Sequence, residues 1–475
     1  MTWTVGAAAA APQPYLQILT LESKRSLGDG ALARRVASPD ARIAARAALA
    51  IGRTKLPAGE PLLAAHLSDP RIPVRALAVF GLGLLATGEN APALVTKVSD
   101  PAGAVRVAAI DAIARYEAAQ RLAGVESTAQ SALEGALAHD RSPIVRSRAA
   151  VALVEFRNAP RAADAAVALS WALRTDCDVE LRRHAMWAIY RGFAPAVGVG
   201  VVESALHDPD EVVRIEATRA MSRFKDAALA DAVRPLLADA SWRVAEQAAQ
   251  TLQALAGKPP TEHWTAIPAF VHLPAIQPDS LAGLPALTKT PGKPSAPQPE
   301  RAPFLSLFPA TAAAMTSPAP AAHPRVRIVT TKGNVYVTLF PEWAPLTVAN
   351  FLNLAGGGYY DGNRWFRIVP DFVVQTGDPH DDGNGDAGFT IGAEENPLEQ
   401  RSYVLSMGLN YDDKTNAPIR DSAGTQYYVT LSPQYHLDRD FTVFGAVSGG
   451  FAVLAHLIES DRVVRVERIA DETLR

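Results

Sequence analysis

Few residues in this 475-residue chain have the types and spacing that metal binding or disulfide chemistry requires. The single cysteine, Cys177, excludes an internal disulfide and any site built from several cysteines. The run 381–386 (DDGNGD) is similar to a calcium-binding loop, but it lacks the glutamate at the twelfth position, so we interpret it as a solvated turn. His436 stands outside any cluster of Cys, His and carboxylate residues, which argues against a metal site. We therefore expect neither a metal nor a cofactor.

Three sequence blocks near the C-terminal end indicate a different chemistry. The first is YDG at 360–362, followed by WFRIVPDFVVQTGDP at 365–379. The second is LSM at 405–407, followed by GTQYYV at 424–429, and the third is HLD at 436–438, followed by FTVFG at 441–445. In this order the blocks resemble the signature of the cyclophilin-type peptidyl-prolyl cis-trans isomerases, and the resemblance covers 325–470.

The resemblance implies isomerisation of X-Pro bonds and assigns roles by position. Arg367 takes the place of the catalytic arginine, with Phe372 and Gln375 as further catalytic positions. Phe372 also matches the proline pocket, and Gln375 matches a polar group that positions the substrate backbone. The substrate-binding positions that the resemblance implies are Val373, Gly408, Gln426, Tyr428, His436, Leu437 and Phe441.

Elementary chemistry agrees with an arginine-based mechanism for this reaction. Rotation about an amide breaks resonance worth ~18–20 kcal/mol, and a thousandfold acceleration requires about 4 kcal/mol. The twisting prolyl nitrogen gains a lone pair, so a guanidinium binds it more strongly than it binds the planar ground state. A charge-assisted hydrogen bond contributes about 1.5–3 kcal/mol, and desolvation by Phe372, Tyr428 and Phe441 is expected to supply the remainder.

The sequence departs from the family pattern at several places. Phe366 stands where a histidine is frequent, Asp371 where a glycine is frequent, and Gly408-Leu-Asn where Ala-Asn-Ala is usual. The segment Asn410–Ala423 is longer than usual and charged. The resemblance places the active site in an outer groove of the barrel, and this segment is expected either to cover that groove in part or to select among substrates.

The elements that must position these residues are predicted from period-two alternation and turn signals. We expect a β-hairpin over 325–340, strands within 364–375, 403–407, 426–431, 443–447 and 463–469, and helices over 345–354 and 451–458. Many short strands with two helices predict a closed antiparallel β-barrel with two capping helices over 325–475.

The region 20–257 repeats a different pattern. An arginine follows an aspartate by six residues, an alanine follows the arginine by three, and successive arginines are 31 to 40 residues apart. This pattern predicts an α-solenoid of two-helix units, and it resembles HEAT repeats. The resemblance implies Asp–Arg ladders between repeats and a concave surface for an unidentified protein partner. The repeated pairs are Asp69/Arg75, Asp100/Arg106, Asp140/Arg146, Asp176/Arg182 and Asp208/Arg214.

The rest of the chain sets its organisation. Residues 258–324 hold 15 of the 36 prolines and are predicted to be a linker, and residues 1–19 an N-terminal tail. A net charge of −3 argues against a nucleic-acid partner, and no apolar run is long enough to span a membrane. Localisation stays open: cytoplasmic because a complete signal peptide is lacking, periplasmic or secreted if the true start lies upstream.

Two functions are therefore carried forward. The first is an isomerase of proline-containing polypeptides whose solenoid recruits clients. The second is a non-catalytic scaffold or folding adaptor that binds proline-containing peptides. The presence of Arg367 favours the first function, and the altered segment Asn410–Ala423 keeps the second open.

Overall fold

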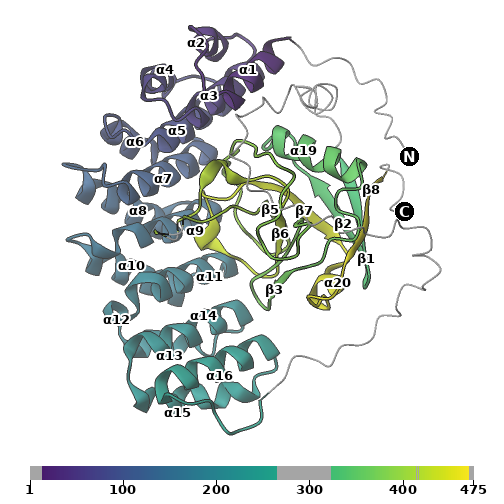
Figure 1. The fold of residues 1–475 in the computed structure, drawn as a ribbon. Helices are drawn as coiled ribbons and strands as arrows, with labels where there is room; N and C mark the ends of the chain where they lie inside the picture. Colours follow the sequence, from purple (N-terminus) through teal and green to yellow (C-terminus); the bar gives the residue numbers. More distant parts are fainter. Residues whose placement is uncertain (1–12, 265–322, 413, 416, 470–475) are drawn as a thin grey trace. The chain divides into compact units, whose positions relative to one another are not determined.

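The computed structural model describes residues 13–264, 323–412, 414–415 and 417–469 (Figure 1). These fall into two compact units: one combines 1–54 with 270–475, and the other is 55–269. Most of the predicted linker and of the predicted N-terminal tail lies outside the described residues. Within the described residues, no helix is both long and apolar enough to cross a membrane.

The unit 55–269 is built from helices that follow one another in antiparallel pairs, as the repeat pattern predicts. Their bounds are α4 Glu60–Ala64, α5 Ile72–Leu85, α6 Ala91–Lys97, α7 Gly103–Ala118, α8 Glu126–His139, α9 Pro143–Ala152, α10 Ala162–Thr175, α11 Val179–Ala188, α12 Ala194–Val197, α13 Val199–Ala205, α14 Glu211–Met221, α15 Ala230–Val233 and α16 Trp242–Ala256.

The Asp–Arg spacing builds a ladder that joins successive repeats. Arg75 donates from Nε to Asp100 of the next repeat at 2.9 Å and from Nη1 to the carbonyl of Asp69 in its own loop at 2.6 Å. Asp100 also accepts from the backbone N–H of Ala102 at 2.9 Å, which fixes the turn before the next helix. The predicted ladder is thus confirmed, and its further rungs are Arg106–Asp140, Arg146–Asp176, Arg182–Asp208 and Arg214–Asp239.

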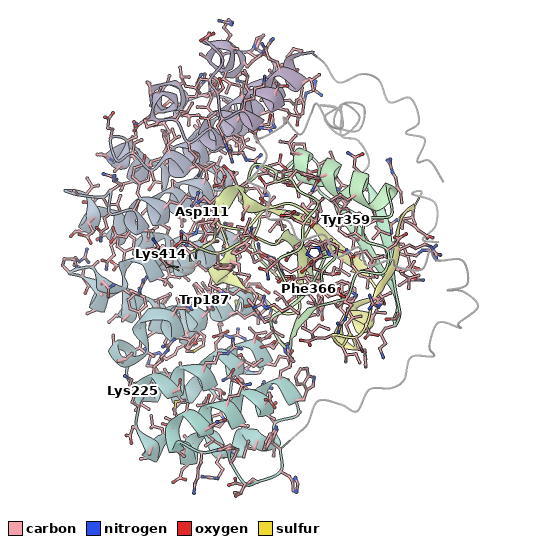
Figure 2. The ribbon with its side chains drawn as sticks, in the orientation of Figure 1. Asp111, Trp187, Lys225, Tyr359, Phe366 and Lys414 are labelled. Carbon is pink, nitrogen blue, oxygen red and sulfur yellow. The ribbon has the colours of Figure 1, made fainter. Side chains whose placement is uncertain are left out.

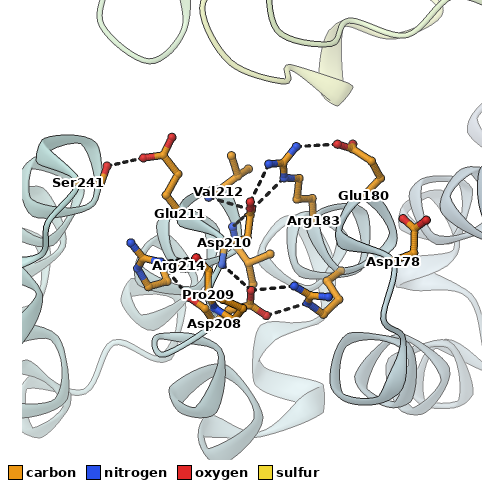
Figure 3. Close-up of polar contacts among 12 residues, drawn as sticks. Asp178, Glu180, Arg183, Asp208, Pro209, Asp210, Glu211, Val212, Arg214 and Ser241 are labelled. Carbon is orange, nitrogen blue, oxygen red and sulfur yellow. Dashed lines mark hydrogen bonds and ion pairs between the residues drawn. The ribbon is translucent and has the colours of Figure 1, made fainter.

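A second row of ion pairs accompanies the last rungs (Figure 3). Arg183 donates to both oxygens of Asp210, at 2.9 and 2.7 Å, and to Glu180 at 2.6 Å. The carboxylate of Asp210 also accepts from the backbone N–H of Val212, so it caps α14. Asp208 and Asp210 therefore both join the start of α14 to the preceding repeat.

Small residues let neighbouring helices of this unit approach closely. A Cβ placed on Gly83 of α5 would lie 2.7 Å from the Cα of Ala112 on α7. The two-helix repeat predicts a second helix between successive arginines, and its apolar spacing places one such helix over 227–237. This region is instead divided into Ala227–Leu229, α15 and Arg234–Ala238, of which the outer two are 3₁₀ turns. Pro235 lacks the N–H that a continuous α-helix would need there.

The other unit contains three N-terminal helices and one eight-stranded antiparallel sheet in the order β3-β4-β6-β5-β7-β2-β1-β8. The helices are α1 Gln13–Ser23, α2 Ala31–Val36 and α3 Ala41–Arg53. The strands are β1 Arg325–Thr330, β2 Gly333–Leu339, β3 Arg367–Val369, β4 Val373–Thr376, β5 Val404–Met407, β6 Tyr427–Thr430, β7 Val443–Gly449 and β8 Val463–Ile469.

The sheet curls around one apolar core, which the longer helix α19 (Pro345–Gly356) completes. The predicted hairpin and strands are confirmed in place, whereas α20 (Phe451–Ala455) is shorter than the predicted helix 451–458. The order of full strands ends at β3 and β8. An isolated antiparallel bridge joins Arg364, which precedes β3, to Arg462, which precedes β8. The predicted antiparallel architecture is therefore confirmed in part, as a curled sheet with two helices.

Candidate active site

The hairpin of β3 and β4 positions the arginine that the sequence singles out. Arg367 pairs across the hairpin with Gln375, and its Nη1 donates to the side-chain oxygen of Gln375 at 3.3 Å. Its guanidinium carbon also lies 5.3 Å from the ring centroid of Phe372, within cation–π range. The turn includes Asp371 at φ 59°, a left-handed conformation that explains why glycine is frequent at this position in the related family.

A relay of amides continues from this arginine into the interior. Gln375 donates from Nε2 to Oε1 of Gln426 at 3.0 Å. Gln426 in turn donates to the carbonyls of Gly383 and Gly385, at 2.9 and 3.1 Å. Because each amide accepts on one side and donates on the other, the relay fixes the orientation of the Gln375 oxygen that faces Arg367.

An apolar cluster, separate from the main core, lies beside this relay. Val373, Tyr428, Leu437 and Phe441 are buried together, and the half-buried Phe372 and Leu409 pack against them. The rings of Tyr428 and Phe441 meet edge to face at 5.9 Å between centroids, and Phe372 stacks on His436 at 5.7 Å. The structure thus brings together the aromatic and aliphatic residues to which the resemblance assigns the substrate-binding positions.

The polar groups that border this cluster are uncharged hydroxyls and an amide. The hydroxyl of Tyr428 donates to Oε1 of Gln400 at 3.3 Å, and Ser406 donates to the same oxygen at 3.0 Å. Burial raises the pKa of Tyr428 well above its usual value, so the phenol stays protonated near neutral pH. Gln400 was not among the residues proposed from the sequence, because it belongs to the loop before β5 and to none of the three blocks.

Gly408 directly follows β5 and lies next to Gln375 and Gln426. Its N–H donates to the carbonyl of Gln426 at 2.8 Å. A Cβ at this position would lie 3.2 Å from Nε2 of Gln375 and from Cβ of Gln426. All ten residues proposed from the sequence therefore belong either to the arginine–glutamine relay or to the apolar cluster and its rim.

Comparisons with known proteins match the two units separately. The family profile described as "Cyclophilin type peptidyl-prolyl cis-trans isomerase/CLD" matches 325–473, and that of HEAT repeats matches 60–154 and 166–256. Peptidyl-prolyl cis-trans isomerase B of Bacillus subtilis is 40% identical over 133 residues, which are 27% of this chain and 87% of that protein. The chain belongs to the cyclophilin-type peptidyl-prolyl cis-trans isomerases.

A second curated relative agrees with this placement. The peptidyl-prolyl cis-trans isomerase of Synechococcus elongatus is 34% identical over 144 residues, 30% of this chain and 94% of that protein. A crystal structure of a Cryptosporidium parvum cyclophilin-type isomerase has 25% identity, covers 31% of this chain and 99% of its own, and matches with a TM-score of 0.29. The C-terminal domain is a cyclophilin-type isomerase domain, and HEAT repeats precede it.

A glycine- and aspartate-rich loop of the cyclophilin domain accepts the last hydrogen bonds of the relay, from Gln426. The buried Asp378 accepts from the backbone N–H groups of His380 at 2.7 Å and Asp382 at 3.0 Å. Asp378, His380 and Asp382 offer ligand atoms within 4.8 Å of one another. Since both oxygens of Asp378 already bind backbone N–H groups, we assign this carboxylate to holding the loop that Gln426 contacts.

The charged segment after Gly408 forms a short hairpin that begins beside the apolar cluster, against which Leu409 packs. Tyr411 and Pro418 are bridged, and Lys414, labelled in Figure 2, lies in the turn between them. Tyr411 and Ile419 are both exposed on this hairpin. The sequence predicted an insertion here but carried no signal for what holds it.

Proposed function

We propose that the cyclophilin domain isomerises X-Pro bonds by hydrogen bonding from Arg367 to the twisting prolyl nitrogen, with the proline ring in the apolar cluster. The observation that supports this most directly is an exposed guanidinium held from one side. Arginine has five N–H donors, and Arg367 gives one of them to Gln375. Among the residues that the structure describes, this is the one hydrogen bond of the guanidinium, which leaves its other donors for a substrate.

The relay gives Arg367 its catalytic value. A guanidinium that is already oriented loses little freedom when the transition state forms, so its interaction strengthens as the amide twists. Such a charge-assisted bond contributes about 1.5–3 kcal/mol. The aromatic rings of Phe372, Tyr428 and Phe441 exclude water from the imide, which is expected to strengthen that bond further.

We also infer that the curled sheet closes into a barrel between β3 and β8. The bridge between Arg364 and Arg462 supports this, as do backbone bonds from Gly362 to Val463 at 2.7 Å and from Trp365 to Asp461 at 3.0 Å. Closure of this kind removes exposed sheet edges, and it gives the short hairpin that carries Arg367 a rigid base.

The HEAT repeats are proposed to bind protein partners and so to bring proline-containing clients to the isomerase, as part of protein folding. The alternative, a scaffold that binds proline-containing peptides without turnover, is kept because the charged hairpin follows directly after Leu409, which packs against the apolar cluster. The two functions differ in turnover and share peptide binding.

The test is isomerisation of a short Ala-Pro-Phe peptide by the full chain, compared with Arg367→Ala. Arg468→Ala, which removes an exposed arginine from β8, is the matched control. We expect catalysis by the wild type and by Arg468→Ala, and a strong loss in Arg367→Ala. Peptide binding with an uncatalysed exchange rate in all three proteins would support the scaffold instead.

A further inference from the structure

The hairpin that begins beside the apolar cluster is closed by its own backbone. Ile419 donates to the carbonyl of Asn410 at 2.7 Å, and Asp412 donates to that of Ala417 at 2.9 Å. At the base, Asn410 donates from its N–H to the hydroxyl of Ser422 at 2.8 Å. We call residues 410–412, 414–415 and 417–419 the rim hairpin. Because the two arms of the hairpin are bonded to each other, its orientation depends on the contacts that its base makes with the rest of the domain.

The base of the rim hairpin is bonded to a residue from the other end of the chain. Arg25, just after α1, donates from Nη2 to Oδ1 of Asp421 at 2.5 Å and to the carbonyl of Ala393 at 3.2 Å. The same oxygen of Asp421 accepts from the backbone N–H of Ala393 at 2.9 Å. The exposed fractions of the two side chains are 16% and 27%, so the ion pair is largely shielded from solvent.

The position of Arg25 is fixed by the local backbone. Its φ is 49°, in the left-handed region, and the N–H of Ser26 bonds to the carbonyl of Leu21 at 2.9 Å, which ends α1. Glycine is the usual residue in this conformation because it has no Cβ. Here an arginine takes this conformation, so its long charged side chain starts from a backbone position that the end of α1 fixes.

A buried ionic network fixes α1 and α3 to the same loop. Arg53, fully buried, donates to the carbonyls of Glu395 at 2.9 Å and Trp343 at 2.8 Å, and to Glu22 of α1 at 2.9 Å. Arg46 of α3 also pairs with Glu22. Because buried charges are costly unless they are paired, this network requires α1 and α3 to pack against residues 393–395 in one arrangement.

The residue that follows the rim hairpin also pairs with a residue next to the pocket. Arg420 donates to Glu395 at 2.7 Å and lies 3.5 Å from Asp440, the residue before the pocket residue Phe441. Leu409, the residue before the rim hairpin, packs against the apolar cluster of the site, so Tyr411 follows two residues after a side chain that contacts the pocket.

We propose that Arg25 is a positioning residue of the isomerase: through Asp421 it holds the rim hairpin so that Tyr411 contacts the substrate beside the proline. The proposal rests on the function proposed above and adds that α1–α3 form part of the isomerase. A peptide long enough to reach the rim hairpin should lose binding when the pair is broken, whereas the bond from Arg367 to the imide should remain.

The experiment compares full-chain wild type, Arg25→Ala, Tyr411→Ala and the exchange Arg25→Asp with Asp421→Arg, using a four-residue and an eight-residue proline peptide. Arg34→Ala, an exposed arginine on α2, is the matched control. We expect KM for the longer peptide to rise about three- to tenfold in Arg25→Ala and in Tyr411→Ala, with kcat within twofold. The charge exchange should restore at least half of the loss, and Arg34→Ala should behave as wild type.

Hydrogen exchange of residues 410–423 gives a second reading that needs no turnover. In Arg25→Ala these amides should exchange faster than in wild type, while those of β5 and β6 stay protected. An unchanged KM for the longer peptide, or unchanged exchange in 410–423, would overturn the proposal. Wild type without catalysis would contradict the proposed function alone, since peptide affinity and exchange would still decide the role of Arg25.

Discussion

The amide relay makes a quantitative prediction about Gln375. Replacing it by glutamate places a carboxylate about where Oε1 now accepts from Arg367 at 3.3 Å. The carboxylate would compete with the imide for the guanidinium and would lose the N–H that now bonds to Gln426 at 3.0 Å. Methionine at the same position removes the hydrogen bonds without adding charge, so it serves as the matched control.

The magnitude follows from the distance and the exposure of the site. Two unit charges 4 Å apart interact with about 1 kcal/mol in water and about 4 kcal/mol at an effective dielectric constant of 20. Because the guanidinium of Arg367 is exposed, we take a value near 1–2 kcal/mol. We therefore expect Gln375→Glu to lower kcat/KM about 5- to 30-fold, and Gln375→Met about two- to tenfold from the loss of a neutral hydrogen bond.

The assay is exchange of a proline peptide followed by NMR at low salt and at 1 M salt. At 1 M the screening length falls to about 3 Å, so Gln375→Glu should recover much of its activity while Gln375→Met should not. Equal effects of salt on the two variants would refute the electrostatic reasoning, because only the glutamate adds a charge.

Two further predictions concern the helical unit. Gly83→Ala should destabilise it by about 1–3 kcal/mol because the new Cβ meets the backbone of Ala112 at 2.7 Å, whereas Gly135→Ala on α8, with nothing within 4 Å, should be neutral or stabilise it by up to about 1 kcal/mol in urea unfolding. Burial, and secondly the charge of Glu126, raises the pKa of Glu117 from 4.5 to about 7. Between these two pH values the folded state keeps a proton that the unfolded state has released. The contribution of this proton to the free energy of unfolding is therefore lost as the pH rises through 7. At pH 8, Glu117→Gln should raise the free energy of unfolding by about 1 kcal/mol after allowing for solvent screening, and with it the melting temperature. At pH 5 the substitution should change both little; equal shifts at both pH values would contradict this assignment.

Much of the local architecture was predictable because it depends on short-range patterns. The six-residue spacing from Asp69 to Arg75 is the span of one loop and one helical turn, so the arginine reaches its own loop carbonyl and the next repeat. The alternation over 325–340 likewise predicted the hairpin of β1 and β2. The division of 227–237 at Pro235 was missed because the apolar spacing continues through it.

The candidate site was predictable for a different reason. Its residues come from three blocks whose order resembles that of a family, and strand pairing brings Arg367 and Gln375 opposite each other. The association of α1–α3 with the C-terminal domain had no such signal. Arg25 and Arg53 contact residues more than 300 positions away, and no local pattern distinguishes them from other arginines in the helices.

The central claim is that Arg367 binds the twisted imide more strongly than the planar one. Its most direct test is to measure kcat/KM and the Kd of the same proline peptide for wild type and Arg367→Ala. We predict that kcat/KM falls about 10- to 150-fold, as a charge-assisted hydrogen bond of about 1.5–3 kcal/mol requires, while Kd changes less than threefold. An affinity that falls as much as the rate, or a rate that does not fall, would contradict the mechanism.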